Sequence, residues 1–120
     1  MDQIKVTKLS STIGVEITGI DFSIKLSNKN IELIYNFLIE NKVIVFRDQR
    51  MDPNTHINFA KNFGDIEPPH PVYPHVDKYP EIVLLENNSN KSPDTDVWHT
   101  DVTFKTKPPF ASILYSNVIP

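Results

Sequence analysis

The chain contains no cysteine. It therefore has no disulfide, no thiolate ligand for a metal and no cysteine nucleophile. Any metal site in this sequence has to use imidazole and carboxylate groups. The chain also lacks an excess of basic residues, because its formal net charge is -3. Nothing in this charge balance favours binding to the phosphates of nucleic acids, so no nucleic-acid partner is expected.

Long apolar runs and nucleotide-binding motifs are absent as well. The opening segment "MDQIKVTKLS" has no apolar core of signal-peptide length. No run approaches the roughly 20 apolar residues of a membrane span. We therefore expect a cytoplasmic protein without membrane contact. The sequence has no GxSxG, P-loop or GxGxxG motif, so neither a serine hydrolase nor a nucleotide-binding protein is supported.

The length of the chain allows one small domain with a hydrophobic core, since it has 120 residues and an ordinary 22% of charged residues. The last segment, "PPFASILYSNVIP", builds an apolar strand pattern that stops at Pro120. No later segment returns that strand to a core. We therefore expect the sequence to be the front part of a longer protein.

Hydrophobic periodicity predicts a chain that is mainly β. Alternating or continuous apolar runs predict strands at residues 4–9, 15–18, 43–47, 81–86, 98–104 and 110–118. The run 43–47 is continuous enough to predict burial on both faces. Because strands outnumber helices and the helices cluster early, we expect a β-sheet core with helices packed outside it.

Two amphipathic helices are predicted in the first half of the chain. The segment 26–41 has apolar residues at helical spacing, and Ser27 is a suitable N-cap. The segment 52–64 begins at Asp52, a second N-cap, and is expected to end at Gly64. The inner stripe of this second helix is expected to consist of Ile57, Ala60 and Phe63.

A proline-rich stretch separates these helices from the remaining strands. Five of the residues between 65 and 80 are prolines, which excludes a helix and argues against a central strand. We expect a long ordered loop, of the kind that often carries function. The loop offers His70, Tyr73 and His75, which are two imidazoles and a phenol able to hydrogen-bond an oxyanion. The alternative is a surface loop whose tyrosine packs on the core.

The stretch "WHTDVTF" carries the second cluster of interest. In a strand, His99 and Asp101 would share one face, next to apolar groups that can exclude water. An imidazole beside a carboxylate is two thirds of the triad that holds non-haem Fe(II) in oxygenases. The alternative is an ordinary His–Asp hydrogen bond at the end of a strand. A second such pair, His75 and Asp77, lies in the proline-rich loop, where a strand geometry is not assured.

Four stretches of the chain resemble one enzyme family. They are "GVEITGIDFS", "VIVFRDQ", "FAKNFGDIEPPHPVYPH" and "WHTDVTF" with the prolines that follow it. Together they are similar to the Fe(II)- and 2-oxoglutarate-dependent family that contains taurine dioxygenase and the 2,4-dichlorophenoxyacetate and alkylsulfatase enzymes. This resemblance implies the N-terminal part of a double-stranded β-helix, or jelly roll. Residues 1–120 would form the N-terminal part of one domain whose C-terminal part is missing.

The resemblance also implies a metal centre. His99 and Asp101 would be iron ligands and catalytic residues, and Val102 would line the pocket beside the iron. The implied cofactors are Fe(II), 2-oxoglutarate as cosubstrate and O2. A distal histidine ligand and the arginine that binds 2-oxoglutarate are expected downstream of this chain.

The substrate implied by the resemblance is taurine or a similar small sulfonate. His70 and Tyr73 would contact the sulfonate. Thr95 stands where the taurine enzymes carry an asparagine near the substrate amine, so another small sulfonate is also considered. Hydroxylation would release sulfite and an aldehyde, with succinate and CO2 from the cosubstrate, in a homo-oligomeric enzyme of sulfur metabolism.

Three alternatives remain open at this point. The first is a family member that acts on another carboxylate or a sulfate ester. The second is a zinc-binding module that recruits His70, His75, His99 and Asp101 together, because imidazole also suits zinc. The third is that the 120-residue piece is inactive alone, because it has only two of three ligands.

Overall fold

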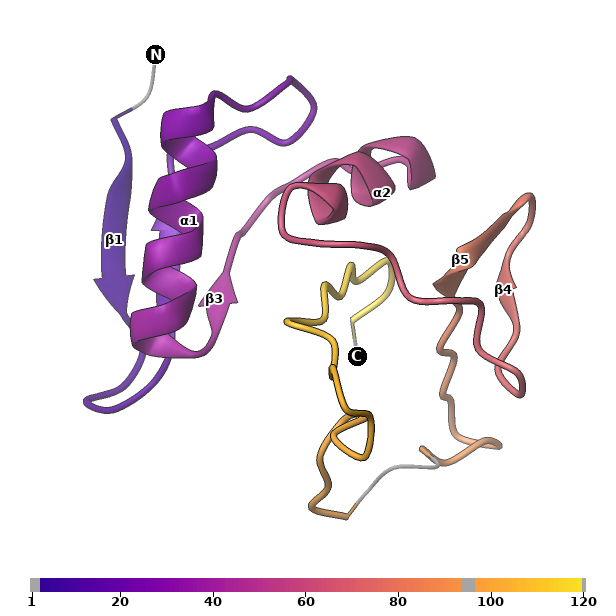
Figure 1. Ribbon diagram of the computed structural model, residues 1–120. Coiled ribbons are helices and arrows are strands. Elements are labelled where there is room, and N and C mark those ends of the chain that lie inside the picture. The colour runs from indigo at the N-terminus through magenta and orange to yellow at the C-terminus, as the bar shows by residue number, and fades with distance from the viewer. Residues whose placement is uncertain (1–2, 94–96, 120) are drawn as a thin grey trace. The chain divides into compact units, whose positions relative to one another are not determined.

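The computed structural model of the protein describes residues 3–93 and 97–119. The chain divides into two compact units, Met1–Asn62 and Phe63–Pro120, and each is described by itself. The elements follow the order β1, β2, α1, β3, α2, β4 and β5 (Figure 1). Neither helix of the described ranges has the length and apolar character that a membrane span requires.

The first unit is built on a three-stranded sheet in the order β1-β2-β3. Strands β1 (Lys5–Lys8) and β2 (Val15–Thr18) are antiparallel, and β3 (Ile44–Val45) is parallel to β2. Val15 and Ile17 of β2 are each only 1% exposed. They alternate with more exposed residues, as expected for a strand with one buried face. The predicted strands at 4–9 and 15–18 are therefore confirmed.

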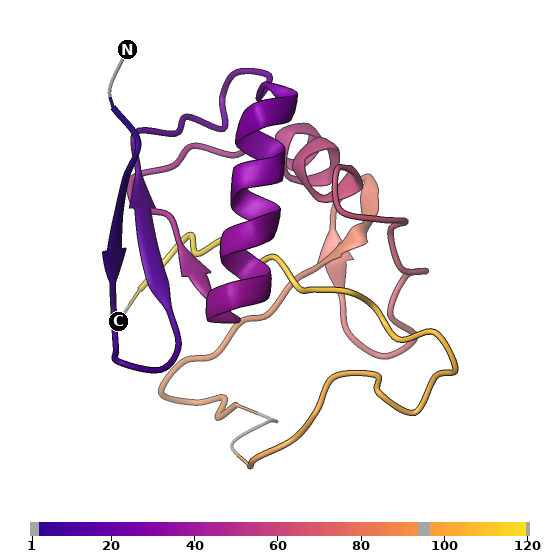
Figure 2. The ribbon, with the colours of Figure 1, turned by 60° about the vertical axis from the view of Figure 1, so that its left-hand side comes forward.

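Helix α1 (Asn28–Asn41) connects β2 to its parallel neighbour β3 and covers one face of the sheet (Figures 1 and 2). Its N-cap is Ser27, whose side chain accepts a hydrogen bond from the Asn30 N–H at 3.2 Å. The helix buries Ile34. The predicted helix and its N-cap are confirmed.

An aromatic cluster joins the second helix of this unit, α2 (Pro53–Lys61), to the rest of the core. The ring of Phe59 lies 4.3 Å from that of Phe22, and the ring of Phe46 lies 4.7 Å from Phe22, measured between centroids. Phe22 and Phe59 are both buried. Edge-to-face and tilted aromatic pairs at this spacing add stabilisation beyond the burial of their surface.

The backbone that leads into this cluster is held at two points. Gly19 has a φ of +82°, and a Cβ placed there would lie 2.5 Å from the carbonyl oxygen of Gln3, so only glycine fits. The side chain of Gln49 donates to the Ile20 carbonyl at 2.8 Å and accepts from the Phe22 N–H at 3.0 Å. The Gln49 amide thus substitutes for the neighbouring strand that would otherwise satisfy these backbone groups.

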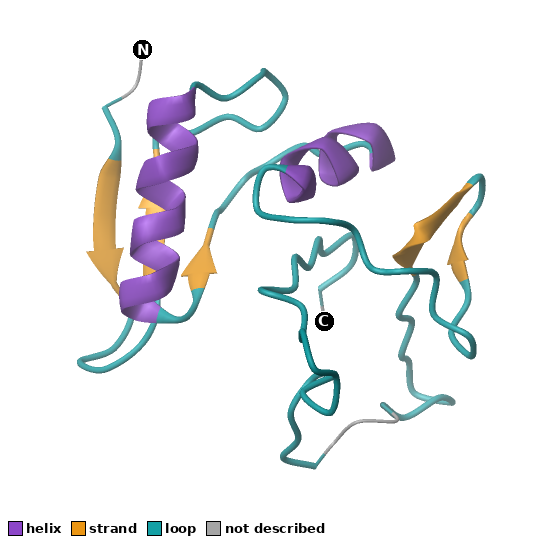
Figure 3. Cartoon of the chain, viewed as in Figure 1, coloured by secondary structure: helices purple, strands orange, loops and turns teal. Residues whose placement is uncertain are grey.

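The second unit contains a two-stranded sheet formed by β4 (His75–Val76) and β5 (Tyr79–Val83). A hydrogen bond from the Leu84 N–H to the Pro74 carbonyl, at 2.8 Å, extends this pairing. Figure 3 shows that the described chain after β5 is loop. Within it, one isolated bridge joins Asn88 to Lys91.

Two predicted strands, 98–104 and 110–118, are wrong, because the described residues there form turns and loops. A strand needs a partner whose backbone groups complete its hydrogen bonds. A third predicted strand was too long. Only Ile44–Val45 of the expected strand 43–47 is paired, and it is not buried on both faces, since Val43 is 46% exposed.

The second helix was predicted correctly at its start and wrongly at its end. Asp52 is the N-cap, whereas the helix ends at Lys61 with Asn62 as C-cap rather than at Gly64. The buried residue of the helix is Phe59, whereas Ile57, Ala60 and Phe63 of the predicted stripe are only half-buried. In all, the described chain contains two small sheets and two helices. The closed jelly roll stays a prediction for the whole family domain.

Acid should weaken the start of α2. The Thr55 N–H donates to the Asp52 carboxylate at 2.8 Å, and this hydrogen bond holds the pKa of Asp52 below its ordinary value of 3.8. Because the folded pKa is depressed, the stabilisation is present above the unfolded pKa and is lost as pH falls through the folded value. Asparagine caps equally well without titrating. We therefore expect Asp52→Asn to make the thermal midpoint less sensitive to pH between about 5 and 2.

The measurement is thermal unfolding by circular dichroism across this pH range, on protein expressed from the complete reading frame. Asp65→Asn, an exposed aspartate outside both helices, is the matched control. An acid profile of Asp52→Asn identical to that of the wild type would contradict the capping argument.

Candidate functional site

His99 and Asp101 lie next to each other, although their segment is not a strand. His99 Nε2 is 3.2 Å from Asp101 Oδ1. The backbone turns directly after them, since the Lys105 N–H donates to the Val102 carbonyl at 3.3 Å. Val102 has a φ of 52°, which is strained for a β-branched residue, and strained residues cluster at functional sites. The two side chains are therefore close without the pleat of a strand, in a loop that a turn follows.

The proton of the His99 ring is placed by its second hydrogen bond. Nδ1 of His99 is 2.9 Å from the carbonyl oxygen of Val97. A carbonyl can only accept, so Nδ1 carries the hydrogen. Metal-binding histidines use the same arrangement, in which the ring nitrogen away from the metal donates to a carbonyl or carboxylate. In the neutral ring Nε2 then carries a lone pair and faces Asp101, so the two atoms can bind one metal ion. In the protonated ring the Nε2–H would donate to Asp101, which is the ordinary His–Asp hydrogen bond considered above.

The spacing of the two donor atoms fits a shared first-row metal ion. Two ligands at about 2.1 Å from one ion and at right angles to each other are separated by about 3.0 Å, close to the observed 3.2 Å. One imidazole and one carboxylate also match part of the 2-His-1-carboxylate set. The side chains of His99 and Asp101 are 48% and 66% exposed, so a further ligand has room to approach.

The described ranges supply no third ligand. Within residues 3–93 and 97–119, no three His, Cys, Asp or Glu side chains gather in a way that could hold a metal ion. The zinc alternative, which needs His70, His75, His99 and Asp101 in one cluster, is therefore wrong for this part of the chain.

The second predicted pair, His75 and Asp77, is arranged differently. His75 lies in β4, and its Nδ1 is 2.8 Å from the Val76 carbonyl oxygen. Asp77 lies in the turn that follows. The ion pairs recorded for the described chain do not include one between these two residues. Of the two His-x-Asp sequences, the structure therefore assembles only the one at His99.

His70 and Tyr73 form a compact unit within the proline-rich loop. His70 Nδ1 accepts hydrogen bonds from the N–H groups of Val72 and Tyr73, both at 3.1 Å. A neutral ring that accepts at Nδ1 carries its hydrogen on Nε2. The two rings lie 4.7 Å apart between centroids. The loop thus presents an Nε2–H donor beside a phenol, as an anion-binding role requires.

Tyr73 also lines a pocket of about 60 Å³. Its other lining residues come from the adjoining Pro74 and from the chain that follows β5: Leu84, Leu85, Glu86, Asn87, Lys91 and Pro93. A pocket of this volume holds several non-hydrogen atoms. The sequence did not predict this lining, because nothing in the periodicity of residues 84–93 indicates that they return to Tyr73.

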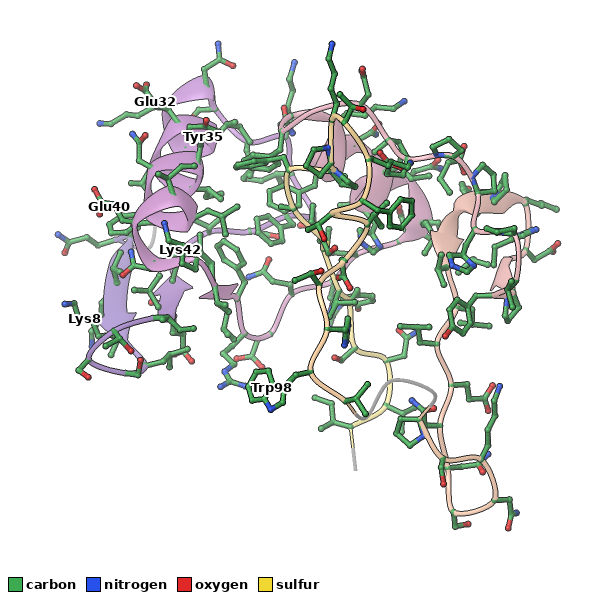
Figure 4. The ribbon with its side chains drawn as sticks, turned by 60° about the horizontal axis from the view of Figure 1, so that its bottom comes forward. Lys8, Glu32, Tyr35, Glu40, Lys42 and Trp98 are labelled. Carbon is green, nitrogen blue, oxygen red and sulfur yellow. The ribbon has the colours of Figure 1, made fainter. Side chains whose placement is uncertain are left out.

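The remaining predicted residues have separate outcomes. Val102 is half-buried, whereas Thr95 lies outside the described residues. The expected apolar cover around His99 is not formed in the described chain. Trp98 is fully exposed, with a relative accessibility of 104% (Figure 4), and Phe104 is 88% exposed.

Comparison with known proteins identifies the family. Residues 5–120 match the family described as taurine catabolism dioxygenase TauD, TfdA family. The chain belongs to this family. Over 98% of its length it is 37% identical to an alkylsulfatase of Acinetobacter baylyi, of which it covers 37%. It is 38% identical to an alpha-ketoglutarate-dependent sulfate ester dioxygenase of Pseudomonas putida, again over 98% of this chain and 38% of the relative.

A solved structure agrees with this assignment. The crystal structure of a taurine dioxygenase from Burkholderia xenovorans matches with a TM-score of 0.71 and 35% identity, over 88% of this chain and 37% of that one. The chain thus spans a little more than a third of the length of the relatives it matches. The predicted resemblance is confirmed at the level of the family, whose related enzymes are 2-oxoglutarate-dependent dioxygenases.

The hydrogen bonds of the loop predict opposite tautomers for two nearby histidines. His70 accepts at Nδ1, whereas His75 places Nδ1 against a carbonyl oxygen. At about pH 8, where an ordinary imidazole is neutral, long-range ¹H–¹⁵N correlation should show the Nε2–H form for His70 and the Nδ1–H form for His75. The same tautomer in both rings would contradict the loop geometry.

Proposed function

We propose that the complete protein is an Fe(II)- and 2-oxoglutarate-dependent dioxygenase that acts on a small sulfonate or sulfate ester. The observation that carries this proposal is the pair of metal-type donors, His99 Nε2 and Asp101 Oδ1, 3.2 Å apart in a member of this family. The substrate class is supported by the relatives, which are named for sulfate esters, alkyl sulfates and taurine.

His99 and Asp101 would hold the iron. Together with 2-oxoglutarate, bound Fe(II) would supply oxidation by O2, with succinate and CO2 as the products of the cosubstrate. Asp101 contributes one negative charge and His99 contributes none, so a divalent ion held by them keeps a net positive charge. This charge favours the anionic cosubstrate. The third ligand and the arginine for 2-oxoglutarate would come from outside this chain.

The loop at His70 would bind the anionic sulfur group. Its Nε2–H and the Tyr73 hydroxyl can both donate to sulfonate or sulfate oxygens, and hydrogen bonds to an ionised acceptor are stronger than neutral ones. Both substrate types present the same anionic oxygens on sulfur. This recognition therefore serves either type, and Val102 would lie beside the carbon that is oxidised.

Hydroxylation at the carbon next to the sulfur group explains the products. A sulfonate R–CH₂–SO₃⁻ becomes R–CH(OH)–SO₃⁻, whose C–S bond breaks to give the aldehyde and hydrogen sulfite. A sulfate ester R–CH₂–O–SO₃⁻ becomes R–CH(OH)–O–SO₃⁻, whose C–O bond breaks to give the aldehyde and hydrogen sulfate. In each case the hydroxyl proton leaves with the anion.

Taurine itself is the narrower proposal. The amine of taurine needs a hydrogen-bond acceptor. At the position where the resemblance implies an asparagine in the taurine enzymes, this chain has Thr95, which offers one hydroxyl oxygen. A hydroxyl can accept a hydrogen bond from an ammonium group. Taurine therefore remains one substrate to test beside sulfonates and alkyl sulfates that lack an amine.

We further propose that residues 1–120 form the N-terminal part of one jelly-roll domain. The exposed apolar side chains of the second unit support this, because a stable surface rarely leaves so many uncovered. They include Trp98, Phe104, Leu114, Val118 and Ile119. That the enzyme is homo-oligomeric and cytoplasmic, and that it has no nucleic-acid or membrane partner, stays a prediction.

Product release tests the proposed activity. Protein from the complete reading frame is supplied with Fe(II), 2-oxoglutarate and O2, together with taurine, other sulfonates or alkyl sulfates. We expect sulfite from a sulfonate or sulfate from an alkyl sulfate, in equal amounts with succinate. Substrate-dependent succinate without either anion would reject the sulfur substrates and retain the dioxygenase. No succinate with any compound would contradict the dioxygenase itself.

Matched variants of the two His-x-Asp pairs test the metal assignment. Asp101→Ala is expected to lower the affinity for Fe(II) by more than the 10- to 100-fold loss typical of outer-shell changes, because it removes a ligand. Asp77→Ala and His75→Ala should bind Fe(II) as the wild type does. Binding is measured by anaerobic titration of Fe(II), with circular dichroism as the check on folding. Equal loss of iron in all three variants would contradict the assignment.

A further inference from the structure

One ion pair joins the two loops that carry the candidate site. Lys105 Nζ lies 2.6 Å from Glu67 Oε2, although the two residues are 38 positions apart in the sequence. Both belong to the second unit. Glu67 precedes His70 by three residues, and Lys105 follows Asp101 by four. The pair therefore links the loop of the proposed anion site to the loop of the proposed metal site.

Each end of this ion pair is coupled to its loop by a stiff segment. Between Glu67 and His70 stand Pro68 and Pro69, whose rings fix φ and limit how far the backbone can bend. At the other end, the Lys105 N–H donates to the Val102 carbonyl, which closes the turn after Asp101. A displacement of either charged residue would therefore be passed on to the neighbouring site residue.

The pair is suited to positioning rather than to stability. Its side chains are 40% and 45% exposed, and exposed ion pairs contribute little to the free energy of unfolding. However, the described residues 63–74 and 97–119 contain no strand or helix that could align the two loops. A contact that closes a long loop fixes the relative position of its ends, even when it stabilises the fold only slightly.

We propose that Glu67 and Lys105 are positioning residues that set the distance between the anion donor on His70 and the ligand pair His99–Asp101. This inference rests on the proposed function, because it assumes that both loops serve one substrate. Neither residue needs to touch the substrate. The arrangement predicts an effect on substrate binding and on the order of both loops, with little effect on Fe(II) affinity.

Two single variants separate positioning from simple charge effects. Glu67→Gln and Lys105→Gln both break the pair, so both are expected to raise KM for the anionic substrate about threefold, within the range of an exposed ion pair. If the charges acted directly on the anion, loss of Lys105 would raise KM and loss of Glu67 would lower it. Opposite shifts would therefore overturn the proposal.

The exchanged pair and a control complete the kinetic experiment. The double variant Glu67→Lys with Lys105→Glu restores the pair in reverse and is expected to return KM to near the wild-type value. Lys107→Gln, an exposed lysine two positions along, should leave KM unchanged. A double variant no better than the single variants, or an equal shift in Lys107→Gln, would count against positioning.

A readout without turnover keeps this test independent of the proposed function. Amide hydrogen exchange is measured by mass spectrometry on peptides that span residues 68–73 and 99–106, in protein from the complete reading frame. Both peptides are expected to exchange faster in each single variant and to recover in the exchanged pair. Unchanged exchange would overturn the proposal, whether or not the enzyme turns over a sulfur substrate.

Discussion

The candidate site depends on one constraint: a histidine ring that is engaged at Nδ1 has only Nε2 left for a ligand. His99 Nδ1 faces a carbonyl oxygen, so in the neutral ring the lone pair lies on Nε2, where a metal ion could bind. His70 accepts at Nδ1 from two backbone N–H groups, so its Nε2–H is the donor that an anion could meet. Two residues of the same type thereby acquire opposite chemistry, because their nearest backbone groups are a carbonyl in one loop and N–H groups in the other.

The two units of the chain use different means to hold their backbone. In the first unit, apolar side chains of β2 and α1 and an aromatic cluster bury against one another, so a core defines the positions of the elements. In the second unit, large apolar side chains such as Trp98 and Phe104 are exposed, and side-chain hydrogen bonds to nearby backbone define the loops. The described residues of the candidate site belong to this second unit, whose loops are held by local polar contacts.

Features that depend on interactions between residues close in the sequence were predicted correctly, and features that depend on distant residues were not. The alternation in β2 and the caps at Ser27 and Asp52 were predicted correctly, because each depends on residues within one or two turns of chain. The strand at residues 98–104 was predicted wrongly, because its residue types favour a strand but no neighbouring strand pairs with it in the described chain. The proximity of His99 and Asp101 was predicted from strand geometry, whereas the structure places them together in a loop.

The sequence by itself determined the family and the starts of both helices. These features depend on local patterns and on motifs that can be read directly from the chain. Only the tertiary structure decided the hydrogen-bond partners of Nδ1 on His70 and His99, the lining of the Tyr73 pocket and the pairing of Glu67 with Lys105. The physical reason is that these depend on which backbone group or distant side chain lies within hydrogen-bond reach, and no periodicity in the sequence encodes that distance.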